Sequence, residues 1–286
     1  MNIIYQELNK LGITYDSVSI LQDKDGVIVS RIIDRTKSYV LKCFQKEDHK
    51  RELQNYCLLE TLGVPTIQVI ASTDCALLLE DIERSPIYRM GVEEDMSDPE
   101  VARCIAVWYK KLHKSGYDYV RQYGQSMYDE SDFFSRDHIS FVKEKTGTQS
   151  LPAWELLEQN FDAIYGFLQK VRRTLTYNDF YYTNMIVAKD KSAAMMFDYN
   201  LLGKGYAYTD IENVLCSMSD EAKEAFLHEY GEYDPAEKAL NNGVSVVVSL
   251  YMACQRDEFP WWAQEILEEV NTTFAEKIRT LQKLLY

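Results

Sequence analysis

The sequence predicts an α+β fold of two unlike lobes: a small lobe with an antiparallel sheet plus a helix, and a large, mostly helical lobe. Segments of β type gather before Glu83, and long helical periods follow it. The 286 residues are 46% hydrophobic and 27% charged, which is ordinary globular usage. Strands first and helices later indicate two lobes with a cleft between them, where ligand sites tend to lie. We expect residues 1–79 to form the small lobe, 80–85 the hinge and 86–286 the large lobe.

The small lobe is predicted from alternating apolar segments. An amphipathic helix carries Ile4 and Leu8, and β-type segments follow at residues 17–21, 27–33 and 39–44. A helix is expected over residues 48–62, with Asp48 as N-cap and Gly63 just past its end. Strands at residues 66–71 and 75–79 complete the lobe.

The large lobe is predicted as helices at residues 98–114, 131–145, 154–173, 220–230, 235–254 and 260–285. Only one segment interrupts them, from Tyr177 to Asp198. There two short apolar runs, residues 185–188 and 194–197, predict a hairpin.

Charge and composition narrow the functional classes. The net charge of −14 would repel a nucleic-acid backbone or an acidic lipid surface, so neither nucleic acid nor a membrane is expected as a partner. No apolar stretch approaches bilayer length, and the first residues lack the basic and apolar regions of a signal peptide. The six cysteines show no C-x-x-C pair. We expect reduced, mostly buried thiols in a cytoplasmic protein.

The hairpin carries oxygen ligands at its two ends. Asp179 and Asn184 precede its first strand, and Asp198 follows its second. Mg²⁺ prefers carboxylate and amide oxygens, and phosphoryl transfer needs such ions plus one carboxylate that receives the proton of the acceptor hydroxyl. The pattern suggests a kinase active site.

Two further features agree with this interpretation. Lys42 lies in an apolar strand, and Glu52 shares its helix face with Tyr56 and Leu59, so a buried ion pair between them would satisfy both charges. A solvated Glu52 on an ordinary helix is the plain alternative. Leu77 to Ile82 reads as a buried strand that runs into an acidic bend at the lobe boundary, where the backbone of Glu80 and Ile82 could meet an adenine edge.

The chain carries, in this order, a strand Lys, a helix Glu, an L-L-x-E-D hinge, a D-x-x-x-x-N loop and a second Asp. This order of motifs resembles the aminoglycoside phosphotransferase and choline kinase family, which has a protein-kinase-like fold. The correspondence covers nearly the whole chain. By that resemblance, Asp179 is the catalytic base, while Asn184 and Asp198 hold Mg²⁺. Lys42, held by Glu52, positions the phosphates of ATP or GTP. Asp210 resembles the aspartate that braces the catalytic loop of the family.

The sequence departs from the family pattern beside the base. The family loop usually reads His-Gly-Asp, whereas this chain has Tyr177-Asn178-Asp179. If the family glycine has a positive φ, Asn is the least costly ordinary replacement. Tyr177 would support the loop as a flat ring with a polar tip. A G-x-G-x-x-G phosphate loop is also absent, because the first sheet turn has only Gly26.

The expected function is ATP-dependent transfer of the γ-phosphate to an alcohol group of a small molecule. Choline-like, aminoglycoside-like and sugar-like acceptors are all open, and a cationic one would suit Glu258, Trp261 and Trp262, which combine carboxylate with aromatic faces. Paired tryptophans are more often core anchors. The alternative function is a nucleotide-binding scaffold of kinase fold with weak or lost turnover, motivated by Tyr177 and Asn178.

Overall fold

The structure, a computed structural model, describes residues 3–35 and 37–285, and these divide into two compact units. The first unit comprises the chain through Gly116, Asp179–Leu202 and Asn213–Gly231, and the second comprises Tyr117–Asn178, Gly203–Glu212 and the residues from Glu232 onward. Residues 80–85 lie inside the first unit. The predicted domain boundaries therefore stay a prediction.

A five-stranded antiparallel sheet forms the beginning of the first unit. Its strands lie in the order β1-β2-β3-β5-β4, with bounds β1 Ser17–Lys24, β2 Val27–Asp34, β3 Lys37–Phe44, β4 Val69–Ser72 and β5 Ala76–Glu80. Asp25 and Gly26 turn β1 into β2 with φ values of 56° and 89°. Positive φ at both central residues matches the twist of a tight hairpin, and Asp and Gly tolerate it better than other residues. The predicted turn is present.

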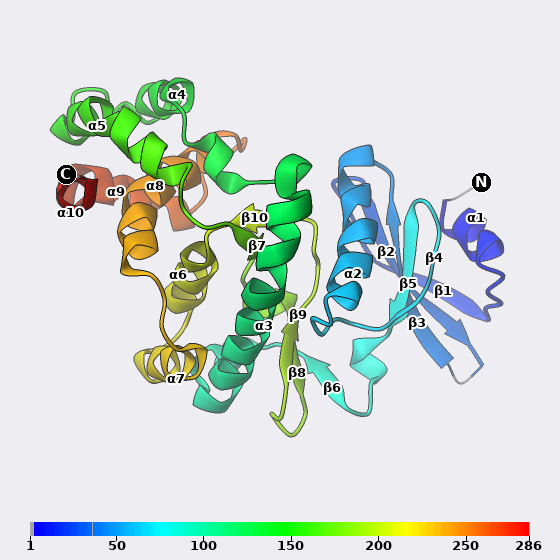
Figure 1. Cartoon of the computed structure of the whole chain (residues 1–286). Helices are drawn as coiled ribbons and strands as arrows, with labels where there is room; N and C mark the ends of the chain where they lie inside the picture. Colours follow the sequence, from blue (N-terminus) through cyan, green and yellow to red (C-terminus); the bar gives the residue numbers. More distant parts are fainter. Residues whose placement is uncertain (1–2, 36, 286) are drawn as a thin grey trace. The chain divides into compact units, whose positions relative to one another are not determined.

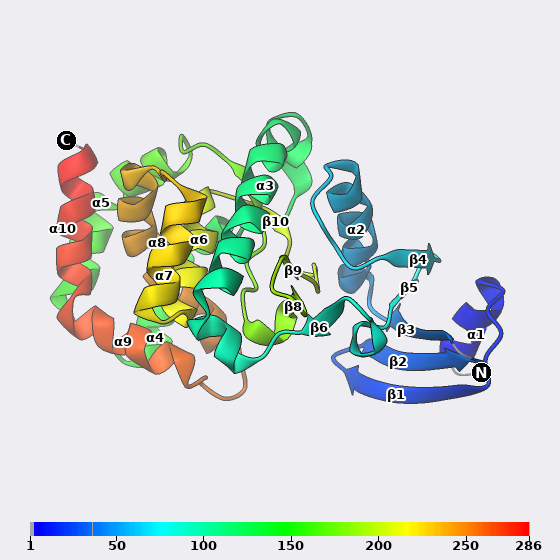
Figure 2. The same ribbon diagram turned by 90° about the horizontal axis from the view of Figure 1, so that it is seen from below.

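The two faces of this sheet carry different side chains. Ile28, Ile32, Leu41 and Leu78 point to one face and pack with Ile4 and Leu8 of α1 (Ile3–Lys10). Because side chains alternate along a strand, Val29, Arg31, Val40 and Lys42 belong to the other face, and they line a pocket. Figures 1 and 2 show α1 and α2 (Arg51–Thr61) on opposite sides of the sheet.

Helix α2 begins later than predicted. Residues Glu47–Lys50 form a 3-10 turn, and α2 itself starts at Arg51 without a side-chain cap, so the prediction of Asp48 as N-cap is wrong. At its other end the prediction holds: Gly63 has a φ of 67°, which suits the left-handed residue after a helix. The tight 3-10 turn carries His49 toward the sheet pocket.

The first unit also contains the hairpin. Strands β8 (Met185–Ala188) and β9 (Ala194–Met196) pair antiparallel as predicted, and β6 (Tyr88–Met90), which the sequence analysis missed, pairs with β8. Helix α7 (Asp220–Tyr230) lies in the same unit. Helix α3 (Pro99–Tyr123) begins in the first unit and ends in the second, and α6 (Ala207–Ser217) begins in the second and ends in the first.

The second unit is mostly helical. Its helices are α4 (Arg136–Thr146), α5 (Pro152–Leu168), α8 (Pro235–Cys254), α9 (Trp262–Thr272) and α10 (Phe274–Leu285). Helix α10 packs against α5 and α8, and α4 and α9 also pack on α8. The rings of Trp154 and Phe274 meet edge to face at 5.5 Å in this core. Strands β7 (Thr174–Thr176) and β10 (Gly203–Gly205) form a two-stranded ribbon.

Three predictions for the helical part are wrong in detail. The segment 260–285 is two helices, because Asn271, Thr272 and Thr273 have poor helix propensity and the chain turns at Thr273. The helix predicted over residues 131–145 begins only at Arg136, where Ser135 caps it by accepting a hydrogen bond from the His138 amide. Strands β7 and β10 also interrupt the predicted helical run, and helix α6 was not predicted.

The cysteines are free, but the expectation that most are buried is wrong. Only Cys43 is buried, while Cys57 and Cys216 are exposed and the other three are half-buried. No helix within residues 3–35 and 37–285 is long and apolar enough to cross a membrane.

Candidate functional site

Three charged side chains meet on the pocket face of the five-stranded sheet. The Lys42 ammonium lies 2.7 Å from the nearer carboxylate oxygen of Glu52 and 3.0 Å from Oδ1 of Asp198. Glu52 is buried at 1% exposure, so its charge needs the cation beside it. The pair inferred from the helix face of Glu52 is therefore present, and the plain alternative of a solvated glutamate is wrong.

Local structure explains why these three groups meet. Lys42 alternates with buried Leu41 and Cys43 on β3, which turns its side chain to the pocket face. Glu52 lies in the first turn of α2 and faces the sheet. Asp198 follows β9 with a left-handed φ of 61°, a conformation that Asp tolerates better than most residues. Backbone strain of this kind is typical of functional positions.

One cation between two carboxylates leaves this cluster with one excess negative charge. Burial, followed by the charge of Asp198, raises the pKa of Glu52 from 4.5 to about 7, against the opposing effect of Lys42. Burial opposes the charge of Lys42, but Glu52 and Asp198 outweigh it and raise the pKa of the ammonium. Lys42 therefore stays charged, and Glu52 is the group that takes up a proton near neutral pH.

We expect Glu52→Gln to remove a pH dependence of stability. The folded protein holds the Glu52 proton up to about pH 7, whereas the unfolded chain loses it near 4.5, so stability falls as pH rises through this window. Between pH 5.5 and 8 the wild type should lose about 2 kcal/mol more free energy of unfolding than the variant. Urea denaturation at both pH values measures this. Glu60→Gln, on the exposed side of α2, is the control; parallel curves for all three proteins would contradict the assignment.

Asn184 joins the hairpin to the predicted base. Its Nδ2 donates to Oδ2 of Asp179 at 2.9 Å and to the Asp179 carbonyl at 3.1 Å. The Phe197 amide donates to the Asn184 carbonyl at 3.0 Å, which ties the end of β9 to the start of β8. The loop that carries Asp179 is thereby fixed to the hairpin that carries Asp198.

The donor set fits a magnesium ion. Because the amide nitrogen of Asn184 faces a carboxylate, its oxygen is left to accept or to bind a cation. The Asp198 side chain is 39% exposed and, like Asn184, lines the pocket. One amide oxygen and one carboxylate are the hard ligands that Mg²⁺ takes while it keeps several waters. Asn184 and Asp198 are therefore suited to hold it, and their role as metal ligands stays a prediction.

In the second unit, Asp210 binds the backbone immediately before Asp179. Its two carboxylate oxygens accept hydrogen bonds from the amides of Tyr177 and Asn178 at 2.8 and 2.9 Å. Asp210 and Tyr177 are both fully buried at 0% exposure. Asn178 has a φ of 65°, the left-handed conformation expected where the family has glycine. Asn at this position therefore costs little in backbone strain.

The pocket brings together six of the predicted residues. It has a volume of ≈ 640 Å³, within the usual range for small-molecule sites. Lys42, Glu52, Glu80, Ile82, Asn184 and Asp198 line it. All of them belong to the first unit.

Sequence reasoning missed the clamp that holds the bend after β5. Arg31 donates to Asp81 at 2.7 Å and to Glu83 at 2.5 Å, and Ser38 also donates to Asp81. Although burial opposes the charge, the hydrogen bonds that Arg31 and Ser38 donate to Asp81 hold the pKa of this carboxyl below its ordinary value. The clamp fixes the backbone from Glu80 to Ile82 against the sheet. The alternation of apolar and polar residues in β2, which places Arg31 on the pocket face, was the available signal.

The predicted acceptor residues lie in the second unit and their role stays a prediction. Glu258 is exposed and Trp261 is 79% exposed, so Trp261 is not a core anchor. Trp262 is half-buried, and the Arg256 guanidinium lies 5.7 Å from its ring centroid. This arginine already lies over one face of the Trp262 ring, where a cationic ligand could otherwise stack.

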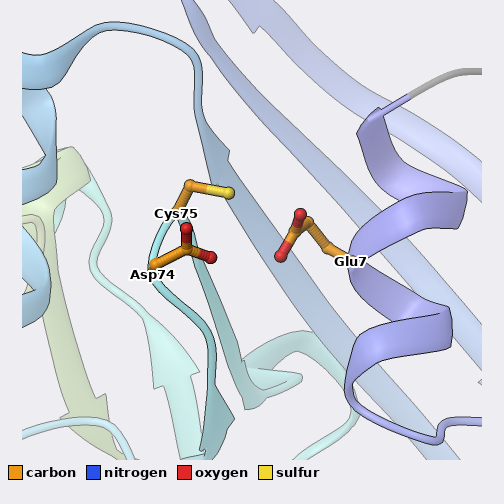
Figure 3. A group of neighbouring side chains, drawn as sticks. All are labelled: Glu7, Asp74 and Cys75. Carbon is orange, nitrogen blue, oxygen red and sulfur yellow. The ribbon is translucent and has the colours of Figure 1, made fainter.

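A separate acidic cluster lies between α1 and the turn that precedes β5. Figure 3 shows Glu7 facing Asp74 and Cys75. A carboxylate oxygen of each acid and the Cys75 sulfur lie within 4.8 Å of one another. Lys10 lies 2.8 Å from Glu7 and 3.3 Å from Asp74, so one ammonium already pairs with both carboxylates. Burial and the neighbouring Glu7 raise the pKa of Cys75, which disfavours the thiolate that a metal needs. The cluster joins α1 to the sheet.

Comparisons with known proteins agree on the fold. No protein-family model matches the sequence, and a search of curated proteins finds no relative. Solved structures are similar over nearly the full chain. Choline kinase LicA from Streptococcus pneumoniae is 13% identical, with 98% of each chain covered and a TM-score of 0.62.

Two antibiotic complexes are also similar. The streptomycin-ATP-APH(2")-IIa ternary complex is 22% identical, with 97% of this chain and 98% of that chain covered and a TM-score of 0.67. Spectinomycin phosphotransferase APH(9)-Ia with ADP and spectinomycin is 13% identical, with 95% and 90% covered and a TM-score of 0.60. The predicted α+β, kinase-like fold is therefore confirmed, and the resemblance stated from the sequence holds at the level of fold.

Proposed function

We propose that this chain, which has the fold of choline kinases and antibiotic phosphotransferases, transfers the γ-phosphate of ATP or GTP to a hydroxyl group of a small molecule. The observation that carries this proposal is the Lys42, Glu52 and Asp198 cluster in a pocket that also contains Asn184 and the clamped bend after β5. A scaffold has no physical need for these groups to converge. Similar structures that contain ATP or ADP support nucleotide binding in this fold.

The chain's own residues supply positioning and charge. Lys42, oriented by Glu52, would bind the α- and β-phosphates, and the backbone from Glu80 to Ile82 would bind the base. Asp179, held by Asn184, would orient the acceptor hydroxyl and take its proton. Mg²⁺ bound at Asn184 and Asp198 would neutralise phosphate charge. Because the transition state of phosphoryl transfer is loose, positioning and charge neutralisation supply most of the catalysis.

The acceptor is proposed to be cationic. A net charge of −14 attracts cations, and the similar structures include a choline kinase and phosphotransferases crystallised with streptomycin or spectinomycin. Neutral sugars carry the same reactive group and are the competing class.

A specific observation supports the second candidate, a nucleotide-binding scaffold of kinase fold. Tyr177, where the family has histidine, is fully buried, and a phenol cannot reproduce every hydrogen bond of an imidazole. Asp179 follows it after one residue, so the buried phenol bears directly on the position of the base.

Two measurements test the proposal together. MgATP should raise the unfolding temperature, since a ligand that binds only the folded state stabilises it. A panel of choline, ethanolamine, aminoglycosides and neutral sugars should then release ADP in an acceptor-dependent way, fastest with the cations. Binding without turnover on any acceptor would support the scaffold. Turnover on neutral sugars alone would exclude the cationic class, and an unchanged unfolding temperature with MgATP would exclude both nucleotide functions.

A further inference from the structure

His49 lines the pocket, and neither of its ring nitrogens is bonded to any residue that the structure describes. It lies in the 3-10 turn that precedes α2, three residues before Glu52. Its Nδ1 is buried and has no hydrogen-bond partner among the residues that the structure describes. Nε2 likewise makes no hydrogen bond to the described residues. Unlike Nδ1, it is not buried, so this edge of the ring is accessible. Native proteins leave few such groups unbonded, and the exceptions are often functional.

The other basic side chains that line the pocket already face carboxylates. Lys42 contacts Glu52 and Asp198, and Arg31 contacts Asp81 and Glu83. Lys24 lies 3.8 Å from Asp25, its neighbour in the turn. Within residues 3–35 and 37–285, His49 is thus the one basic group lining this pocket without an acidic partner. An anionic ligand would find an uncommitted donor there.

The turn between β1 and β2 does not offer the usual backbone cradle for phosphates. It contains a single glycine, Gly26, and a Cβ at this position would lie 3.0 Å from the side chain of Lys46. Asp25 and Lys24 of the same turn both line the pocket, so the turn adds no net positive charge that would attract phosphate. Binding of a triphosphate in this pocket must therefore rely on side-chain donors more than in proteins with a glycine-rich loop.

We propose that His49 binds a phosphate group of the nucleotide, with Nε2–H as the donor. In the tautomer with the proton on Nε2, the buried Nδ1 is an acceptor, and the accessible edge of the ring carries an N–H donor. Hydrogen bonds to charged phosphate oxygens are stronger than neutral ones. This inference rests on the proposed function, and it adds a phosphate-binding residue from the turn before α2.

The test compares ligands with and without phosphates. We would measure the dissociation constants of MgATP and adenosine for the wild type, His49→Ala, His49→Gln and His49→Asn by calorimetry. Loss of a bond to a charged group should weaken MgATP binding by about tenfold or more in His49→Ala, with adenosine binding unchanged. The Gln amide nitrogen can occupy the position of Nε2, so His49→Gln should retain most of the affinity, whereas His49→Asn, whose amide matches Nδ1, should not.

His228→Ala is the matched control, since His228 is an exposed histidine of the same unit outside the pocket. Equal weakening of MgATP and adenosine in His49→Ala would show that His49 only supports the fold, and unchanged MgATP binding would equally overturn the inference. A wild type that binds no MgATP would instead remove the proposed function itself, and the inference with it.

Discussion

Asp179→Asn is expected to slow acceptor-dependent phosphoryl transfer by about 10²- to 10⁴-fold, the range for loss of a general base. An amide cannot take the proton of the acceptor hydroxyl at neutral pH. Its oxygen can still accept the hydrogen bond that Asn184 donates at 2.9 Å, so the loop should keep its shape. MgATP binding should therefore remain close to that of the wild type, which separates loss of chemistry from loss of binding.

The measurement is ADP release with the preferred acceptor, alongside the thermal shift with MgATP. Asp190→Asn is the matched control, because Asp190 is an exposed carboxylate in the turn of the same hairpin. Its turnover should equal that of the wild type. If Asp179→Asn retained a turnover within threefold of the wild type, Asp179 would not be the base. Identical slow ATP hydrolysis in the wild type and in Asp179→Asn would favour the scaffold function.

Asp210→Ala is expected to lower the free energy of unfolding of the second unit by about 2–4 kcal/mol. The variant leaves the amides of Tyr177 and Asn178 without their acceptor, and each unsatisfied buried donor costs about 1–3 kcal/mol. Tyr177 is fully buried, so water cannot replace the lost acceptor without rearrangement. Turnover should fall as well, since these two residues lead directly into Asp179.

Urea denaturation and hydrogen exchange of the two amides measure this effect. Exchange at residues 177 and 178 should accelerate in the variant before the rest of the second unit is affected. Asp118→Ala is the control, because Asp118 is an exposed carboxylate of the second unit whose side chain is 78% accessible. Asp210→Asn, which keeps one acceptor oxygen, should fall between Ala and wild type. Unchanged amide exchange in Asp210→Ala would show that the bonds contribute nothing to the loop.

The strands of the five-stranded sheet and of the hairpin were predictable because each is an alternating or continuous apolar run bounded by turn signals. The Asp25-Gly26 turn and the Met185–Ala188 hairpin strand are examples that the structure confirms. The elements that were missed are short or weakly patterned. Strands β7 and β10 have three residues each, and β10 consists of Gly203, Lys204 and Gly205, whose composition predicts a loop. They pair only because the surrounding unit brings them together.

The candidate site was predictable where a buried charge requires an opposite charge beside it. A lysine in an apolar strand and a glutamate on a buried helix face need each other, so Lys42 and Glu52 could be paired from sequence. The third member could not be placed so directly, since the contact between Lys42 and Asp198 joins residues 156 positions apart. Arg31 and His49 were missed because their importance depends on which neighbouring charges are already paired.

The sequence by itself determined the types of side chain available for the candidate site, their order along the chain and the α+β class. Alternation, helical periods and oxygen-bearing side chains are local properties of the sequence. Tertiary structure alone decided which charges are satisfied. It gave Lys42 two carboxylates and clamped Asp81 with Arg31, and it left the His49 ring in the same pocket without a partner among residues 3–35 and 37–285. The reason is physical: pairing and burial depend on distances of a few ångströms between segments far apart in the chain, and these distances exist only after folding.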